Sequence, residues 1–217
     1  MVLLGRIKSN WLRIVVHIAA WVPLAWIAWH YWQGLYLVDP VREITTITGK
    51  TALILLMLSL ACTPINTVFG WKRVIRVRRA LGVYAFMYAA LHFLVFIGLD
   101  YRFDFGLIWQ AIFDQRYVLV GFAAGVILLV LAITSTRGWK RRLRKAWKRL
   151  HKLVYAAGIL AVVHFLWLMK DAQEPSRYAL ILAALLFLRI PNVRRTIVRA
   201  RRRLGAAWQQ RSVELST

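Results

Sequence analysis

Residues 137–169 read RGWKRRLRKAWKRLHKLVYAAGILAVVHFLWLM, and this stretch decides the class of fold. From Arg137 to Lys152 it carries nine Lys and Arg side chains and no Asp or Glu. From Leu153 to Met169 it carries none of these four residue types. An apolar run of about 20 residues is long enough to cross a bilayer as one helix. A basic segment directly before such a run indicates the cytoplasmic side of a membrane protein.

The same alternation of charged and apolar sequence continues on both sides of this stretch. Basic segments, with formal charges of +3, +5, +9 and +7, alternate along the chain with segments whose formal charges are 0, −1 and 0. An apolar run separates each segment from the next. Because Lys and Arg accumulate in cytoplasmic loops, this pattern predicts an even number of spans with both termini in the cytoplasm. The basic segments are expected to contact the lipid bilayer at its anionic headgroups. The pI of about 11.5 therefore does not indicate a nucleic-acid partner.

The whole chain, residues 1–217, is predicted to form a single all-α domain, a polytopic membrane helix bundle with a basic cytoplasmic tail from about 191 to 217. Its loops are too short for a soluble nucleotide-binding or catalytic domain, and no internal repeat is apparent. Cys62 is the only cysteine, which excludes a disulfide, a zinc site or an iron–sulfur cluster within one chain. The expected transmembrane helices, about six, are residues 11–32, 49–69, 80–99, 117–135, 153–169 and 178–190.

Two histidines are predicted to lie at the same depth in the bilayer. His92 comes eight residues before Asp100, and His164 comes seven residues before Asp171, on helices that run in the same direction. At about 1.5 Å per residue, both lie about 10–12 Å inside the outer ends of their helices. Imidazoles from two facing helices can ligate the iron of a b-type haem. Alanines on the preceding turns would leave room for a flat cofactor. We therefore predict that His92 and His164 are the axial ligands of one haem iron; the alternative is two hydrogen-bonded core histidines.

The inner half of the bundle offers a second set of polar residues whose role stays open. His151 comes thirteen residues before His164, and on an ideal helix the two side chains would point in different directions. The positions fourteen and thirteen residues before His92 are Arg78 and Arg79, not histidine. His17 has roughly the depth of His151 and could pair with it. We expect inner-side cofactor contacts from these residues, to a second haem, a flavin or a quinone. The alternative is that they bind lipid headgroups.

Several short motifs carry a resemblance to a known family, and the resemblance covers nearly the whole chain. The most specific block runs from Leu131 to Lys170. Two positions depart from the family pattern. This chain has Gln115-Arg116-Tyr117 where the family has Arg-Pro-Tyr, and another residue replaces a glycine of the basic loop near Arg144. The matching motifs are Thr48-Gly49-Lys50-x-Ala52-Leu53, Thr63-Pro64, Arg78-Arg79-x-Leu81-Gly82, Tyr88-x-x-x-His92, Leu131-Ala132-Ile133-Thr134-Ser135, Trp147-x-x-Leu150-His151-Lys152-Leu153-x-Tyr155 and His164-Phe165-x-Trp167.

By these motifs the chain resembles the MsrQ (YedZ) family, the haem-binding membrane subunits of bacterial periplasmic methionine sulfoxide reductases, within the ferric-reductase-like transmembrane group. The resemblance implies a multi-pass protein of the bacterial inner (cytoplasmic) membrane that binds haem b and FMN. It implies electron transfer from the quinone pool, or from a cytosolic flavin reductase, to a periplasmic molybdopterin reductase subunit (MsrP-like). That partner repairs methionine sulfoxide in oxidised envelope proteins. The chain itself would be a non-catalytic electron-transfer subunit of an oxidoreductase complex.

Two other functions stay open from the sequence. The first is a stand-alone ferric-reductase-like or oxidase-like transmembrane cytochrome b, although such proteins usually carry fused flavin and nicotinamide domains. The second is a non-redox membrane scaffold. Apart from histidines, the spans show no convincing midplane charge of the kind that marks a transporter. The cofactor content of the purified protein separates the redox functions from the scaffold.

Overall fold

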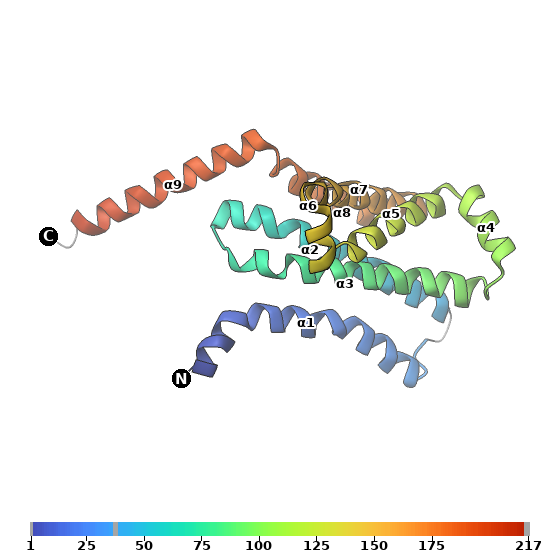
Figure 1. The fold of residues 1–217 in the computed structure, drawn as a ribbon. Coiled ribbons are helices and arrows are strands. Elements are labelled where there is room, and N and C mark those ends of the chain that lie inside the picture. The colour runs from blue at the N-terminus through green and yellow to red at the C-terminus, as the bar shows by residue number, and fades with distance from the viewer. Residues whose placement is uncertain (1, 37–38, 215–217) are drawn as a thin grey trace.

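The computed structural model describes residues 2–36 and 39–214, which form helices joined by short turns and contain no strand (Figure 1). The prediction of an all-α membrane protein is therefore confirmed. The elements are α1 (Val2–Trp32), α2 (Pro40–Phe69), α3 (Arg73–Val95), the π-helical turn η1 (Phe96–Asp100), α4 (Phe105–Asp114), α5 (Arg116–Ile133), α6 (Arg137–Leu150), α7 (Leu153–Leu168), α8 (Gln173–Phe187) and α9 (Pro191–Glu214).

Four of the helices are long and apolar enough to cross a membrane alone: α1 from Trp11, α2, α3 continued by η1, and α5. Two further pairs reach that length only together, α6 with α7 and α8 with α9, and they are bent by 53° and 72°. With 16 and 15 residues, α7 and α8 are about 24 and 22 Å long, less than the ~30 Å hydrocarbon core. The described residues therefore contain four to six spans.

The second span starts earlier than the apolar run predicts, at Pro40 instead of residue 49. Asp39 caps the helix by accepting a hydrogen bond from the Arg42 backbone N–H at 3.0 Å, and Pro40 takes the first helical position. The first backbone N–H groups of a helix have no partner within the helix. A proline has no such N–H, and a carboxylate accepts a hydrogen bond from one, so both residue types are favoured at these positions. The helix ends at Gly70, which has φ +73°.

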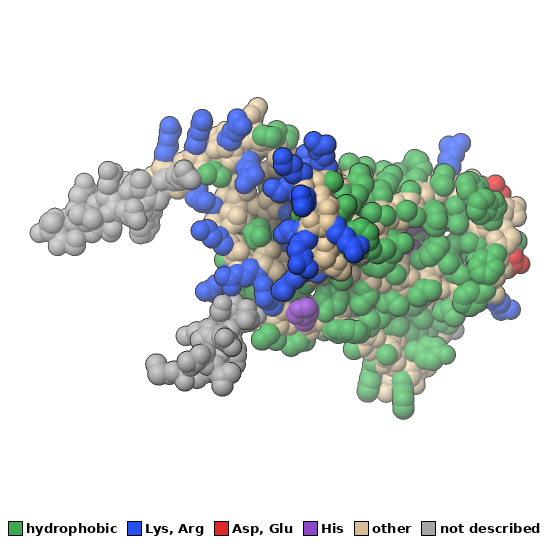
Figure 2. Space-filling view, in the orientation of Figure 1, with side chains coloured by type: hydrophobic (Ala, Val, Ile, Leu, Met, Phe, Trp, Pro, Cys, Tyr) green, Lys and Arg blue, Asp and Glu red, His purple; other side chains and the backbone are tan. Residues whose placement is uncertain are grey.

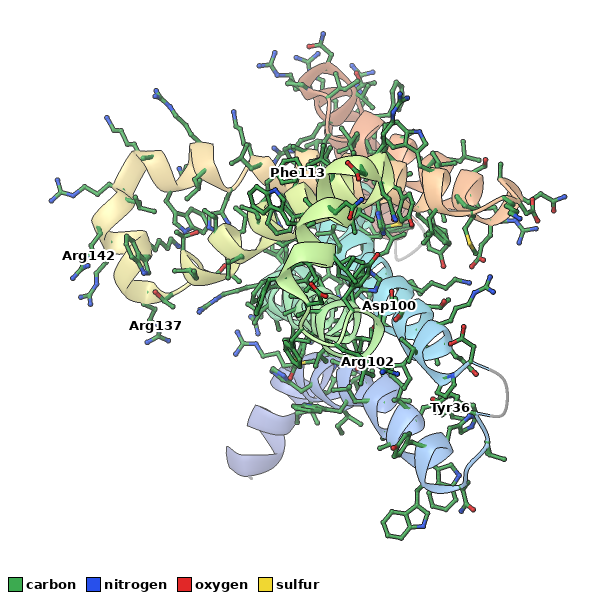
Figure 3. The ribbon with its side chains drawn as sticks, turned by 90° about the vertical axis from the view of Figure 1, so that its right-hand side faces the viewer. Tyr36, Asp100, Arg102, Phe113, Arg137 and Arg142 are labelled. Atoms are coloured by element: carbon green, nitrogen blue, oxygen red, sulfur yellow. The ribbon has the colours of Figure 1, made fainter. Side chains whose placement is uncertain are left out.

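The bundle is built around α2 and α3, which pack side by side, and around α5 and α7, which do the same (Figure 1). In Figure 2, Lys and Arg side chains gather over the half of the molecule with α6 and α9, and the Asp and Glu side chains in view lie at the opposite end. Viewed from that opposite end, α6 projects sideways with Arg137 and Arg142 pointing away from the bundle (Figure 3). The predicted separation of charge is thus present between the two ends. Which end faces the cytoplasm stays a prediction.

Helix α1 is attached to the bundle through two tyrosines of α3. Tyr88 is completely buried, and its hydroxyl donates to the backbone carbonyl of Ala20 at 2.6 Å. One turn earlier on α3, the Tyr84 hydroxyl hydrogen-bonds His17 Nδ1 at 2.8 Å. These tyrosines precede His92 on its own helix face, but both are engaged by α1. Between Trp11 and Trp32, most other side chains of α1 are exposed, as expected for a helix that faces lipid.

Arg144 is the strained residue of the basic helix α6. It has φ +44° and ψ −114° inside the segment Arg137–Leu150, and α6 kinks there. A side chain in this region of the backbone map costs on the order of 1–3 kcal/mol, whereas glycine adopts it readily. The family resemblance described above leads us to expect a glycine near this position. The substitution noted in the sequence therefore falls on a backbone conformation that glycine suits better.

Replacing Arg144 with Gly is expected to raise stability, by about 1 kcal/mol, because it removes this strain. The matched control is Arg141→Gly, which removes the same charge from the same exposed helix at a position whose φ is not positive. That control should lower stability by up to about 1 kcal/mol, the usual cost of Gly inside a helix. Thermal unfolding of the detergent-solubilised proteins, followed by circular dichroism, measures both. Equal losses for the two variants would show that Arg144 is not strained.

Two arginines from the C-terminal part of the chain donate to backbone carbonyls of α2. Pro64 lies inside α2 and has no N–H, so the carbonyl of Leu60 lacks its helical partner. The Arg189 guanidinium donates Nη2–H to this carbonyl and Nη1–H to the Tyr155 hydroxyl, the latter at 2.7 Å. Near the end of α2, Arg201 Nη1 donates to the carbonyls of residues 66 and 67, both at 2.9 Å. The turn after α8 and the first half of α9 are thereby fixed to α2.

Candidate functional site

His92 on α3 and His164 on α7 lie beside each other in the bundle. Their ring centres are 6.2 Å apart, and the ring planes stand at 85° to one another. Both side chains are partly buried. The sequence predicts a shared depth for these residues, and the structure brings the two rings together.

Each of the two rings is held by a backbone carbonyl on its other side. His92 Nδ1 lies 2.9 Å from the Thr45 carbonyl oxygen, and His164 Nδ1 lies 2.7 Å from the Tyr117 carbonyl oxygen. A carbonyl oxygen can only accept, so the Nδ1 atom of each ring carries the proton and donates it. Nε2 is then left as the nitrogen with a free lone pair. Histidines that ligate metals usually show this arrangement, because the second hydrogen bond fixes the tautomer and the orientation of the ring.

A glycine lies against each of the two rings. A Cβ atom built at Gly49 on α2 would stand 2.9 Å from His92 Nδ1, and one built at Gly121 on α5 would stand 2.6 Å from His164 Nδ1. From the sequence, Gly49 is only part of a motif at the start of a predicted span. The structure gives Gly49 and Gly121 a contact that no pattern of apolar residues reveals.

The carbonyl and the glycine that contact each histidine ring occur at the same spacing in both halves of the chain. In each, the acceptor carbonyl belongs to the residue four positions before the glycine, and corresponding residues are always 72 positions apart. The sequence contains this repeat when it is aligned at that offset. Ala-x-x-x-Ala-x-x-His-Phe-Leu stands at residues 85–94 and again at 157–166, and Gly-x-x-Ala-x-x-x-Leu at 49–56 and at 121–128. The expectation of no internal repeat is therefore wrong.

The alanines that precede the two histidines pack in the core. Ala85 and Ala157 are completely buried in one apolar cluster with Tyr88, Leu56 and Leu128. Such alanines were predicted to leave space for a flat cofactor, whereas Ala85 and Ala157 form helix contacts in this structure. Close helix packing through small residues is common in membrane bundles. The features that fit a metal ligand are therefore the two imidazoles and their supports.

The inner-side residues do not form one cluster. The His151 ring stacks on Trp147 with 4.0 Å between ring centres, and its Nε2 lies 3.2 Å from the Thr134 hydroxyl. His17 instead contacts Tyr84, so the described contacts do not support a pairing of His17 with His151. Arg78 donates to the Thr63 hydroxyl at 3.3 Å, and it lies close enough to His151 to affect its charge. Arg79 is exposed.

Arg189 lies at the end of the span predicted at residues 178–190, and the sequence indicated no functional role for it. It is partly buried, lies close enough to Arg78 to interact electrostatically, and leaves its Nε buried without a partner among the described residues. The signal that could have identified it is Pro64, whose missing N–H requires a donor for the Leu60 carbonyl from another helix. A proline inside a span does not, however, reveal which distant residue supplies that donor.

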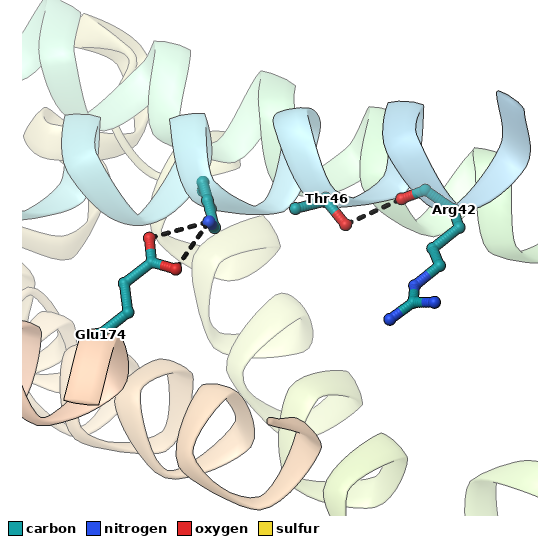
Figure 4. A network of polar contacts seen from close by, with 4 residues as sticks. Arg42, Thr46 and Glu174 are labelled. Carbon is teal, nitrogen blue, oxygen red and sulfur yellow. Dashed lines mark hydrogen bonds and ion pairs between the residues drawn. The ribbon is translucent and has the colours of Figure 1, made fainter. Parts of the chain in front are cut away.

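The residue next to Gly49 forms an ion pair between α2 and α8. Lys50 Nζ on α2 lies 2.7 and 2.8 Å from the two carboxylate oxygens of Glu174 on α8 (Figure 4). The Lys50 ammonium also lies 5.9 Å from the centre of the Phe165 ring, which follows His164 in the chain. This pair connects α8 to α2 at the level of the two histidines. Both side chains remain partly exposed, so the pair contributes little stability on its own.

Comparison with known proteins assigns the chain to a family. Residues 48–162 match the model of the ferric reductase like transmembrane component. A protein of Xanthomonas axonopodis pv. citri called the heme-binding subunit MsrQ of protein-methionine-sulfoxide reductase is 47% identical over 185 residues, covering 82% of this chain and 85% of its own. The chain belongs to the MsrQ family. The Rhodospirillum rubrum MsrQ is 44% identical over 186 residues, covering 84% of this chain and 89% of its own.

Proposed function

We propose that this member of the MsrQ family is a membrane subunit that carries electrons on haem b, with His92 and His164 as the axial ligands of the iron. The observation that carries the proposal is the pair of facing imidazoles, 6.2 Å between ring centres, each with Nδ1 bound to a carbonyl. Metal–imidazole bonds are about 2.0 Å long, so two imidazoles on opposite sides of one metal ion have ring centres about 6 Å apart. The residues present therefore fit the group.

When bound, haem would supply a carrier that accepts and releases one electron at a time. The chain's own residues do the rest. His92 and His164 would hold the iron through Nε2, and the carbonyls of Thr45 and Tyr117 keep each ring in the tautomer that leaves Nε2 free. The apolar helices around them exclude water, which favours the less charged state of an iron centre. The protein thus determines position and potential, and the cofactor provides the redox chemistry.

The proposed acceptor is a periplasmic molybdopterin methionine sulfoxide reductase subunit. Reduction of methionine sulfoxide to methionine consumes two electrons and two protons and releases water, so the acceptor must collect two single electrons. The names of the relatives, heme-binding subunits of protein-methionine-sulfoxide reductase, support this partner. The histidine pair lies toward the end of α3 that continues into η1 and Asp100, and the charge pattern predicts that this end faces the periplasmic side of the bacterial inner membrane.

The proposed donor is the quinone pool or a cytosolic flavin reductase, acting from the inner side. His151 and Arg78 are near one another there, and with Arg79 and His17 they remain the candidates for contact with a second haem, FMN or quinone. No Asp or Glu neutralises Arg78 or Arg189 among the described contacts. An anionic or carbonyl-bearing cofactor would find hydrogen-bond donors at this position.

The test of the function is a reduced-minus-oxidised visible spectrum of the purified protein, with haem and flavin quantified per chain. We expect a six-coordinate b-type spectrum with close to one haem per chain, and oxidation of the reduced haem when the reductase subunit and a sulfoxide substrate are added. Two haems per chain would bring His151 into ligation. A haem that reduces ferric iron without the partner would favour a stand-alone cytochrome b. Absence of haem from protein purified with its native lipid would overturn the proposal and favour a scaffold.

A further inference from the structure

We propose that Gly49 and Gly121 are positioning residues for the two imidazoles, and that the absence of a Cβ at these positions is what permits each Nδ1 hydrogen bond. The inference rests on the proposed function, because its readouts are those of a bound haem. It concerns residues that neither the family match nor the relatives' names assign a role. Both glycines lie on helices that do not carry the histidine they serve, Gly49 on α2 and Gly121 on α5.

The first argument is the space that each ring occupies. A Cβ at Gly121 would meet His164 Nδ1 at 2.6 Å and Cε1 at 2.9 Å, and one at Gly49 would meet His92 Nδ1 at 2.9 Å and Cε1 at 3.0 Å. Comfortable contacts between such atoms lie at about 3.5–4.0 Å. An alanine would therefore push each ring off the helix surface. Among the described glycines, only these two would place a Cβ against an imidazole.

The second argument is the carbonyl that accepts the proton of each ring. In an α-helix the N–H of Gly49 binds the Thr45 carbonyl, and the N–H of Gly121 binds the Tyr117 carbonyl. A carbonyl oxygen has a second lone pair, and the Nδ1–H of His92 or His164 uses it. A side chain on the residue four positions later would cover that lone pair. The glycine thus leaves the second lone pair of the carbonyl oxygen accessible, whereas a side chain at this position of a transmembrane helix would cover it.

The third argument is that the arrangement occurs twice in one chain. Carbonyl, glycine and histidine are separated by the same intervals in both halves, with the second set 72 residues after the first. Gly125 provides the contrast, because it lies one turn from Gly121 on the same helix and a Cβ there would meet nothing within 4 Å. Packing between helices alone does not explain why two glycines of this chain both contact an imidazole Nδ1 edge.

Loss of the Nδ1 hydrogen bond has consequences that differ from loss of stability. A donated Nδ1–H raises the basicity of Nε2 and fixes the ring plane, and removal of such a partner typically lowers metal affinity 10–100-fold. A less basic ligand stabilises the ferric state less, so the midpoint potential rises. A changed ring plane alters the low-spin ferric resonance, which depends on the angle between the two imidazoles, 85° here.

The experiment compares Gly121→Ala, Gly49→Ala and the control Gly125→Ala in the full-length protein. We measure haem per chain, the midpoint potential and the electron paramagnetic resonance spectrum of the ferric haem. Gly121→Ala is expected to lose at least 10-fold in haem affinity, Gly49→Ala less, because its clash is milder, with a raised potential and a shifted resonance. Gly125→Ala should match the wild type in all three. Because Ala forms helices better than Gly, weaker helices cannot cause the loss.

The outcomes separate this inference from the proposed function. If the wild type binds haem and both Gly121→Ala and Gly49→Ala keep its haem content, potential and resonance, the glycines are not positioning residues and the haem assignment survives. If Gly121→Ala does not accumulate in the membrane, Gly49→Ala decides in the same way. Equal losses in Gly125→Ala would show a general packing effect and would also overturn the inference. If the wild type itself lacks haem, the proposed function fails first.

Discussion

Replacement of His164 by Ala should remove the haem spectrum, reducing haem per chain to less than about a tenth of the wild-type value. The reason is that the iron would lose one of two protein ligands, and the cavity left by the imidazole offers no other nitrogen, since Tyr117 presents only its carbonyl. His92→Ala should do the same, because Thr45 likewise offers only a carbonyl. Haem is measured by pyridine haemochrome on membranes with equal amounts of protein.

The control for both substitutions is His30→Ala. His30 lies at the end of α1, where its ring centre is 4.1 Å from that of Trp26 and 5.9 Å from that of Tyr36, and it has no place in the histidine pair. It should keep the wild-type haem content. His164→Met sharpens the test, because a thioether can replace an imidazole as a ligand and raises the potential when it does. If His164→Met and His92→Ala both keep the full haem content with an unchanged midpoint potential, His92 and His164 are not ligands of the iron.

Substitution of Arg189 by Met should lower the free energy of unfolding by about 1–3 kcal/mol. This side chain supplies two hydrogen bonds from a charged donor, to the Tyr155 hydroxyl and to the Leu60 carbonyl that Pro64 leaves free. No water is present in the hydrocarbon core to replace them. Arg189→Lys should recover only part of the loss, because an ammonium lacks the fork that reaches both acceptors. Thermal unfolding, read out by the reaction of the buried thiol of Cys62, measures each variant.

The Pro64→Ala background shows whether the Leu60 carbonyl is the cause. An alanine at position 64 restores the backbone N–H, which then donates to Leu60 within α2. Arg189→Met should therefore cost less in this background, with a coupling of about 1 kcal/mol, within the range measured for hydrogen bonds between membrane helices. Fully additive losses would show that Arg189 stabilises the bundle through Tyr155 or by packing alone.

Much of the fold is local information and could be predicted. The length of each apolar run and the bases beside it follow from the properties of single segments, so the predicted all-α bundle matches the helices. The boundaries were less accurate where capping decides them, as at Asp39 and Pro40. The bends after α6 and α8 were missed, because hydrophobicity alone does not report where a helix axis turns.

The candidate site was predictable only in part. Equal depth on two helices was enough to select His92 and His164, since helical rise converts sequence distance into height. The depth of a residue does not determine which way its side chain faces. The suggested pairing of His17 with His151 is not seen, because His17 hydrogen-bonds Tyr84 instead. Alanines near the histidines were interpreted as open space, but alanines also allow close packing, and here they do so.

The sequence by itself determined that this chain crosses a membrane several times as helices, that most of its bases and most of its acids lie at opposite ends, and that two histidines share a depth. Those properties depend on residue type and on spacing within one segment. Only the tertiary structure decided that a ring from α3 lies on Gly49 of α2 and a ring from α7 on Gly121 of α5. The physical reason is that such contacts join segments 43 positions apart in the chain. Their geometry depends on how whole helices pack, which no local pattern encodes.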